Sequence, residues 1–137
     1  MDFAFAPGFF QGGKYVAAVH YPDGAYVAPV GYYGSGLSSR PATPGETVLL
    51  YGTGFGPTNP AVAPGQIYCC GAPVTDLTQL QVTIGGAPAT VSWAGIVAAG
   101  EFQLNVLIPP LPDGDQPVAA TIAGVSTQSG LSISVKN

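Results

Sequence analysis

Hydrophobic and polar residues alternate along short stretches of the chain, as they do in strands that are buried on one face. The stretch "EFQLNVLIPP" shows this clearly: Phe102, Leu104, Val106 and Ile108 fall on one face, and the alternation stops at two prolines. Glycine and proline recur at short intervals elsewhere, and no longer window keeps a helical period. The pattern therefore predicts short strands and no helix.

Four further stretches predict strands. "ETVLLYGTGF" is a single strand, and "LQVTIGGAPATVSW" predicts a hairpin with Gly85 and Gly86 in its turn. "KYVAAVHYPDGAYVAPV" predicts a second hairpin that turns at Asp23 and Gly24, and "QPVAATIAGVSTQSGLSISVKN" predicts a third that turns near Gly124. Roughly seven to nine strands at a spacing of about 8 to 12 residues are typical of an all-β sandwich.

The strand in "LLYGTGFGPTNP" runs into three glycines at alternate positions, Gly52, Gly54 and Gly56. A loop that cradles phosphate would place its glycines before a helix and close to a lysine. Here two prolines prevent a helix from following, and no lysine follows closely. We therefore predict a strand that bends at its glycines, with Phe55 buried in the core.

The segment "PGETVLLYGTGFG" resembles the IPT/TIG domains, an Ig-like fold shared by plexins and some transcription factors. Their hallmark is a glycine, an apolar strand and then a Gly-x-Gly-Phe sequence. The matching positions are Gly45, Val48, Leu50, Gly52, Gly54 and Phe55. The hairpin "VTIGGAPATV" looks like the second hallmark of that fold, so the resemblance implies an Ig-like β-sandwich.

A closer likeness covers nearly the whole chain. The motifs "APGFF", "AAVHYPDG", "RPATPGETVLLYGTGFGPTNP", "VTIGGAPATVSWAG", "EFQLNVLIP" and "GDQPVAATIAGVSTQSGLSISV" together look like the uncharacterised C-terminal domain named after Solibacter. That domain ends large secreted proteins of soil bacteria. The resemblance implies an extracytoplasmic Ig-like sandwich with no known catalysis. Because "APGFF" would normally follow a preceding domain, its place at the start of this chain suggests a stand-alone or processed subunit.

The composition is unusual for a soluble domain. The 137 residues are enough for one domain with a real core, but only 7% of them are charged and 47% are hydrophobic. Ordinary soluble domains carry about 25% charged residues. Either other subunits cover much of the surface, or the surface is neutral, as in many secreted β proteins.

The charge balance excludes several classes of partner. The net charge is −4 and the only basic residues are Lys14, Arg40 and Lys136, so no basic stripe for nucleic acid or anionic membrane can form. No apolar run approaches the roughly 18 residues that span a bilayer, and "MDFAFAPGFF" lacks the pattern of a secretory signal. We expect no nucleic-acid partner and no membrane insertion. The rest of the composition favours an extracellular or cell-surface location.

The first 40 residues hold 9 of the 14 aromatic residues. We divide the chain into an aromatic N-terminal arm or hairpin, residues 1–40, and an Ig-like β-sandwich, residues 41–137. An aromatic arm can add a strand to a neighbouring sheet, so we expect copies of the chain to associate head to tail into a surface or filamentous assembly. The predicted subunit-interface residues are Phe3, Phe5, Phe9, Phe10 and Tyr15.

Two alternatives to the arm stay open. Exposed tyrosines on a β-sandwich can stack on sugars, which would make the chain an adhesion or carbohydrate-binding module that uses Tyr26, Tyr32 and Tyr33. The aromatic rings can also simply belong to the core and edges of their own domain.

Few residues suggest catalysis or metal binding. His20 is the only histidine, and we predict that it is a partly exposed sheet residue. Asp113 and Asp115 lie in "PDGDQP", which is better explained as a turn than as a calcium loop. Glu46 and Glu101 each begin a predicted strand, and nothing in the sequence brings them together as a catalytic pair. We therefore predict a non-enzymatic protein with no catalytic residue, cofactor or metal.

The pair Cys69 and Cys70 is a candidate disulfide, since the chain has no third cysteine. Adjacent Cα atoms lie about 3.8 Å apart, below the usual disulfide range of roughly 4.4 to 6.8 Å. Three states are open: free buried thiols, a strained bridge between neighbours, or bonds to neighbouring subunits.

Overall fold

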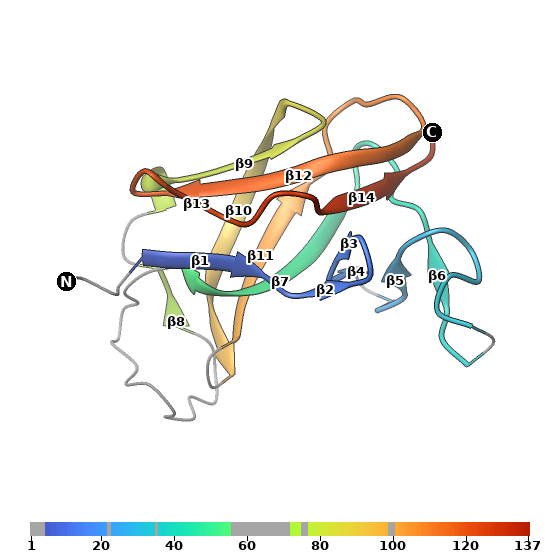
Figure 1. Cartoon of the computed structure of the whole chain (residues 1–137), viewed down its shortest axis with the longest axis horizontal. Coiled ribbons are helices and arrows are strands. Elements are labelled where there is room, and N and C mark those ends of the chain that lie inside the picture. The colour runs from blue at the N-terminus through green and yellow to red at the C-terminus, as the bar shows by residue number, and fades with distance from the viewer. Residues whose placement is uncertain (1–4, 22, 35, 56–71, 75–76, 99–100) are drawn as a thin grey trace.

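The computed structural model describes residues 5–21, 23–34, 36–55, 72–74, 77–98 and 101–137. In these residues two layers of strands pack face to face and no α-helix occurs, so the predicted all-β, Ig-like sandwich is confirmed (Figure 1). The strands are β1 (Phe5–Phe9), β2 (Gln11–Gly12), β3 (Tyr15–Val16), β4 (Ala18–His20), β5 (Tyr26–Val27), β6 (Ser39–Arg40), β7 (Thr47–Phe55), β8 (Ala72–Pro73), β9 (Leu80–Ile84), β10 (Ala87–Ala98), β11 (Glu101–Leu107), β12 (Gly114–Ile122), β13 (Val125–Ser126) and β14 (Ser132–Val135), with a 3-10 turn η1 (Leu77–Gln79). Seven strands have four or more residues, in line with the predicted number.

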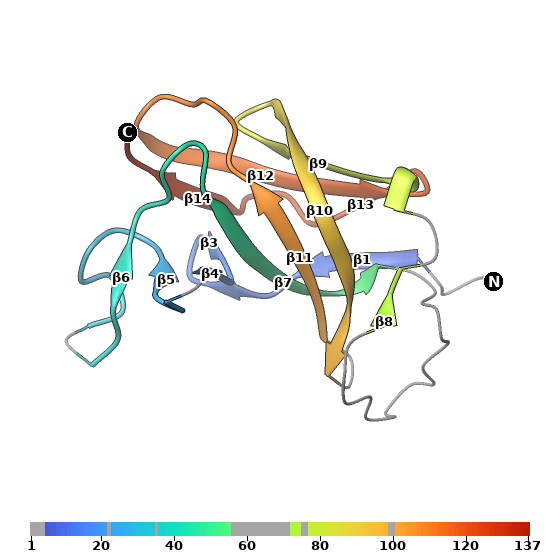
Figure 2. The same ribbon diagram turned by 180° about the vertical axis from the view of Figure 1, so that it is seen from behind.

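One layer is built on β7, β11 and β10. Strand β11 lies antiparallel between the other two, so that Leu104 is opposite Leu50 on one side and Ala94 on the other. Strands β1 and β4 both pair with β7, and β5 and β6 extend the sheet beyond β4 (Figure 2).

The other layer has the order β9, β12, β14, β3 and β2. Strand β10 joins the two layers, because its first residues pair with β9 and the rest pair with β11. The register shifts between Val91 and Trp93, where the long strand passes from one layer to the other. Such irregularities are the usual way for one strand to serve two sheets.

The core follows the alternation of the sequence. Phe102, Leu104, Val106 and Ile108 are all buried, as predicted from "EFQLNVLIPP". Phe55 has no exposed surface, which confirms its predicted place in the core. The three predicted hairpins are also present, as β4–β5, β9–β10 and β12–β13.

Residues from the N-terminal part of the chain belong to the same core. Phe9, Val16, Ala18 and Val27 pack in one cluster with the buried residues of the later strands. The division of the chain into 1–40 and 41–137 stays a prediction, but the described strands of the first segment are packed on the second.

The first residue of the turn between β12 and β13, Ala123, has a left-handed backbone conformation that alanine rarely adopts. Ala123 has a φ of 50° and Gly124 a φ of 82°, the two positive values of a tight two-residue turn between the paired residues Ile122 and Val125. Glycine, asparagine and aspartate suit the first turn position, whereas alanine pays roughly 1–2 kcal/mol for the left-handed conformation.

We expect Ala123→Asn to raise the free energy of unfolding by about 1 kcal/mol, because asparagine adopts this conformation at lower cost. Urea unfolding followed by tryptophan fluorescence measures the change. Ala119→Asn, at an exposed position of strand β12, is the matched control and should give no gain. A decrease in stability for Ala123→Asn would contradict the conformational argument.

Candidate functional site

Four tyrosines form a continuous chain of ring contacts, which we call the tyrosine cluster. Tyr15 comes from β3 and Tyr26 from β5, whereas Tyr32 and Tyr33 lie in the loop after β5. The ring centroids of Tyr15 and Tyr32 are 4.9 Å apart, and those of Tyr32 and Tyr33 are 5.0 Å apart. The centroids of Tyr33 and Tyr26 are 5.3 Å apart. The residues named from the sequence as glycan-stacking candidates, Tyr26, Tyr32 and Tyr33, therefore lie together.

The cluster runs from the interior to the surface. Tyr15 is buried, Tyr33 is half-buried, and Tyr26 and Tyr32 expose 39% and 42% of their surface. Tyr32 packs edge-on against both Tyr15 and Tyr33, with interplanar angles of 89° and 90°. A buried ring at one end thus holds the exposed rings in place.

Two glycines of the β2–β3 hairpin lie directly beneath the outer rings. A side chain on Gly12 would meet the Tyr33 hydroxyl at 2.5 Å, and one on Gly13 would meet the Tyr32 hydroxyl. Gly13 also has a φ of 63°, which favours glycine. The pair Gly12–Gly13 therefore forms a seat for the two tyrosines, and nothing in the sequence pattern pointed to it.

An ion pair holds the inner end of the cluster. The Tyr15 hydroxyl donates to Asp115 Oδ1 at 2.7 Å, and Lys14 Nζ lies 2.8 Å from Asp115 Oδ2. The hydrogen bonds from Lys14 and from Tyr15 hold the pKa of Asp115 below its usual value. Burial, together with the bond to Asp115, raises the pKa of Tyr15, and burial raises the pKa of Tyr33. At neutral pH the phenols of Tyr15 and Tyr33 thus keep their protons.

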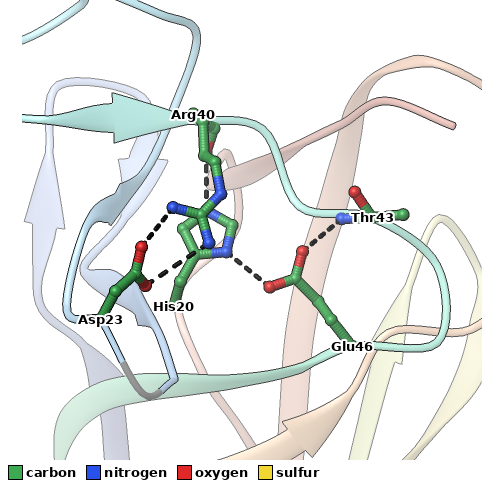
Figure 3. Close-up of polar contacts among 5 residues, drawn as sticks. All are labelled: His20, Asp23, Arg40, Thr43 and Glu46. Carbon is green, nitrogen blue, oxygen red and sulfur yellow. Dashed lines mark hydrogen bonds and ion pairs between the residues drawn. The ribbon is translucent and has the colours of Figure 1, made fainter.

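His20 is the centre of a second polar group, shown in Figure 3. Its Nδ1 lies 2.5 Å from Glu46 Oε1, and its Nε2 donates to the carbonyl oxygen of Arg40 at 2.8 Å. Glu46 also accepts a bond from the backbone N–H of Thr43 at 2.6 Å. Arg40 in turn pairs with the exposed Asp23, with 2.6 Å between Nη1 and Oδ2.

The prediction that His20 is partly exposed is wrong, because its side chain has no exposed surface. Its strand pairs with β7 and packs inward, on the face that buries Val16 and Ala18. A buried imidazole needs partners for both nitrogens, and here Glu46 and the Arg40 carbonyl provide them. The group joins β4 to β6 and to the turn before β7.

Strand β1 has an unusual outer edge. Its inner side pairs with β7, where Gly8 is opposite Thr53 and Phe9 is opposite Gly52. On the outer side, the side-chain amide of Gln128 accepts from the Phe9 N–H at 3.0 Å and donates to the Phe9 carbonyl at 2.6 Å. One side chain therefore makes the two bonds that a neighbouring strand would make.

The predicted interface residues have different surroundings. Phe9 and Tyr15 are buried within the chain, and Phe10 is 41% exposed. Phe5 begins β1, and Phe3 lies outside the described residues. The candidate disulfide, Cys69 and Cys70, also lies outside the described residues.

No group of three or more His, Cys, Asp or Glu residues that could hold a metal ion occurs in the described part of the chain. Glu46 precedes β7 and Glu101 begins β11, and because these strands are antiparallel with Thr47 opposite Leu107, the two carboxylates lie at opposite ends. Asp113 accepts bonds from the N–H and the side chain of Asn137, which hold its pKa below the usual value.

No helix within the described ranges is long and apolar enough to cross a membrane.

Comparison with known proteins identifies the fold family. The model of the IPT/TIG domain matches residues 35–135, which is well over half of the chain. No curated protein and no solved structure matches the chain significantly. The chain therefore belongs to the IPT/TIG family of Ig-like domains.

Proposed function

We propose that this IPT/TIG-family chain is a non-enzymatic extracellular structural module that associates with copies of itself by exchanging strand β1. IPT/TIG domains often occur in extracellular, adhesion or signalling proteins, which supports this setting. The closer relationship to the Solibacter-type C-terminal domain, and the resulting filamentous or surface assembly, are parts of the same proposal. The observation that carries the proposal is that β1 pairs with β7 on one side, while Gln128 occupies the backbone groups of Phe9 on the other side.

The edge of β1 is closed to simple strand addition. Pro7 has no N–H to offer to a neighbour, and proline within a strand is typical of sheet edges. The N–H and carbonyl of Phe9 are occupied by Gln128. A neighbouring chain can therefore use this region most readily by replacing β1 instead of extending the sheet beyond it.

Exchange recreates the same contacts between two chains. Phe9 would pack on the Phe55 of a neighbour, as it does at 5.6 Å within the chain, and Gly8 would again lie against Gly52. The β2–β3 hairpin with Gly12 and Gly13 supplies a hinge, since strand exchange needs only a connecting segment that can open. Head-to-tail exchange of this kind extends into a filament when the rotation between subunits does not close.

A disulfide between β1 and β7 tests the exchange. In a Cys69→Ser, Cys70→Ser background, Gly8→Cys and Thr53→Cys place thiols on paired residues of β1 and β7. Exchange predicts a concentration-dependent ladder of covalent oligomers on a non-reducing gel after oxidation at near-neutral pH. Electron microscopy of the unmodified protein should then show fibres, and deletion of residues 1–10 should abolish them.

Tyr51→Cys with Gln103→Cys is the matched control, because these two residues are paired on β7 and β11, two strands that stay within one sandwich. That pair should give only cross-linked monomers. If the β1–β7 pair also gives only monomers at every concentration, the chain keeps its own β1 and the exchange proposal fails.

A second candidate function is adhesion to a carbohydrate. It is favoured by the tyrosine cluster, which presents Tyr26 and Tyr32 to solvent on a rigid support. Exposed apolar patches that are rimmed by polar groups often mark contact sites. The exposed rings of Tyr26 and Tyr32 lie on β5 and the loop after it, whereas self-association uses β1.

A further inference from the structure

We infer that the tyrosine cluster binds an uncharged polysaccharide, with Tyr26 and Tyr32 as the contact rings and Gly12–Gly13 as the residues that position them. This inference rests on the adhesion candidate proposed above and specifies its ligand. The contact rings lie on β5 and on the loop that follows it, whereas the exchanged strand is β1; the two proposals share only the Gly12–Gly13 segment.

The chemistry of the cluster suits a sugar ring. An aromatic ring offers an apolar face and, in tyrosine, a hydroxyl at its edge, so it matches a pyranose that has C–H groups on its face and hydroxyls at its rim. Tyr26 and Tyr32 are both partly exposed, and the rings of both contact the ring of Tyr33. The edge-on packing of Tyr32 against Tyr15 and Tyr33 fixes the orientation of its ring before a ligand arrives. Preorganised rings lose little conformational entropy on binding.

The charges around the cluster favour a neutral ligand. Lys14, whose ammonium lies 5.4 Å from the centroid of the Tyr15 ring, is paired with Asp115 at 2.8 Å. Arg40, which lies on the neighbouring strand β6, is paired with Asp23. With both nearby cations neutralised and a net charge of −4, an acidic polysaccharide has no charge partner and meets net repulsion.

The two glycines allow a test in which the rings are displaced but not removed. A methyl group on Gly12 would overlap the Tyr33 hydroxyl, and something must shift to accommodate it. Tyr33 contacts both Tyr26 and Tyr32, so its displacement disturbs the two contact rings without removing either of them.

Affinity gel electrophoresis and isothermal titration calorimetry test the inference with the intact chain. The neutral probes are hydroxyethyl cellulose, laminarin and soluble xylan, and the acidic probes are alginate and polygalacturonate. We expect binding to at least one neutral probe and none to the acidic ones. Tyr26→Ala and Tyr32→Ala should each weaken binding by about 3- to 10-fold, the range expected for one aromatic contact.

Two further variants separate the site from general effects. Tyr21→Ala removes a tyrosine that is 67% exposed and makes no ring contact with the cluster among the described residues, so binding should be unchanged. Gly12→Ala should weaken binding although every tyrosine remains, and circular dichroism should show that all four variants stay folded.

The outcomes distinguish this inference from the candidate function on which it rests. Binding to acidic probes alone would overturn the neutral ligand but keep carbohydrate adhesion. Binding to neutral probes that survives both Tyr26→Ala and Tyr32→Ala would overturn the assignment of the site. Failure to bind any of the probes would overturn the inference and, with it, the carbohydrate form of the adhesion candidate.

Discussion

Replacement of His20 by alanine is expected to lower the free energy of unfolding by about 3 kcal/mol, with a fall in the melting temperature of about 10 °C. His20 is enclosed, and its two nitrogens bond Glu46 and the Arg40 carbonyl. The substitution leaves a void and takes one partner from each of these groups. A buried polar group that loses its partner costs more than the bond itself contributed.

The arrangement of protons explains why this histidine is hard to replace. A carbonyl oxygen only accepts, so Nε2 must carry the proton that it shares with Arg40. A further proton must lie between Nδ1 and Glu46 Oε1, which are 2.5 Å apart. Imidazole can hydrogen-bond in both of these directions at once, and alanine replaces neither bond.

Urea unfolding of His20→Ala and of Asp23→Ala measures the effect against a control from the same corner of the molecule (Figure 3). Asp23 bonds Arg40 at the surface, where its carboxylate is half exposed. An exposed ion pair contributes little, so Asp23→Ala should leave the unfolding midpoint nearly unchanged. Equal midpoints for the two variants would show that the buried group contributes nothing beyond a surface pair.

The example of His20 shows where sequence reasoning stops. The alternation of Val16, Ala18 and His20 already places the histidine on the buried face, and a strict use of the two-residue period would have found it. Its partner could not be found in that way, because Glu46 is 26 residues further along the chain and reaches it only through the pairing of β4 with β7.

The tyrosine cluster and the β1 edge show the same limit. An excess of aromatic residues in the first 40 positions singled out Tyr26, Tyr32 and Tyr33 as candidate contact residues. The parallel pairing of β5 with β6, which folds the intervening loop back, has no local signal. Gln128 is likewise an ordinary polar residue of a loop until the fold brings it to Phe9, 119 positions away.

By contrast, features that depend on neighbouring residues were predictable. Each correctly predicted hairpin has its turn residues and its alternating strands within a single short stretch of sequence. The Gly-x-Gly-Phe segment combines a local pattern with a family likeness, and the match of the IPT/TIG model to residues 35–135 agrees with both.

Phe55→Ala is expected to cost about 4 kcal/mol of unfolding free energy, because Phe55 is fully enclosed and lies at the junction of three strands. Its ring is 5.6 Å from that of Phe9 on β1 and 6.0 Å from that of Phe102 on β11. The ring also lies close to the backbone at Gly52, where a side chain would meet the Phe55 ring at 2.9 Å and also the carbonyl of Gly8. Removal of the ring therefore leaves a cavity between β1, β7 and β11, and the cavity adds to the cost of the lost apolar contacts.

Phe10→Ala provides the control for Phe55→Ala, since Phe10 is aromatic, follows β1 directly and is 41% exposed. Its loss should cost about 1 kcal/mol or less, as is usual for surface positions. Urea unfolding compares the two variants, and hydrogen exchange adds a local measurement.

The Phe10 N–H bonds the Tyr51 carbonyl at 3.0 Å and so reports on the end of β1. Because the Phe55 ring packs on Phe9 of β1, its removal should speed exchange of this amide at urea concentrations well below the midpoint of global unfolding. If that amide keeps its protection until global unfolding, β1 is held by its backbone pairing alone. Phe55 would then stabilise the core but not the attachment of β1.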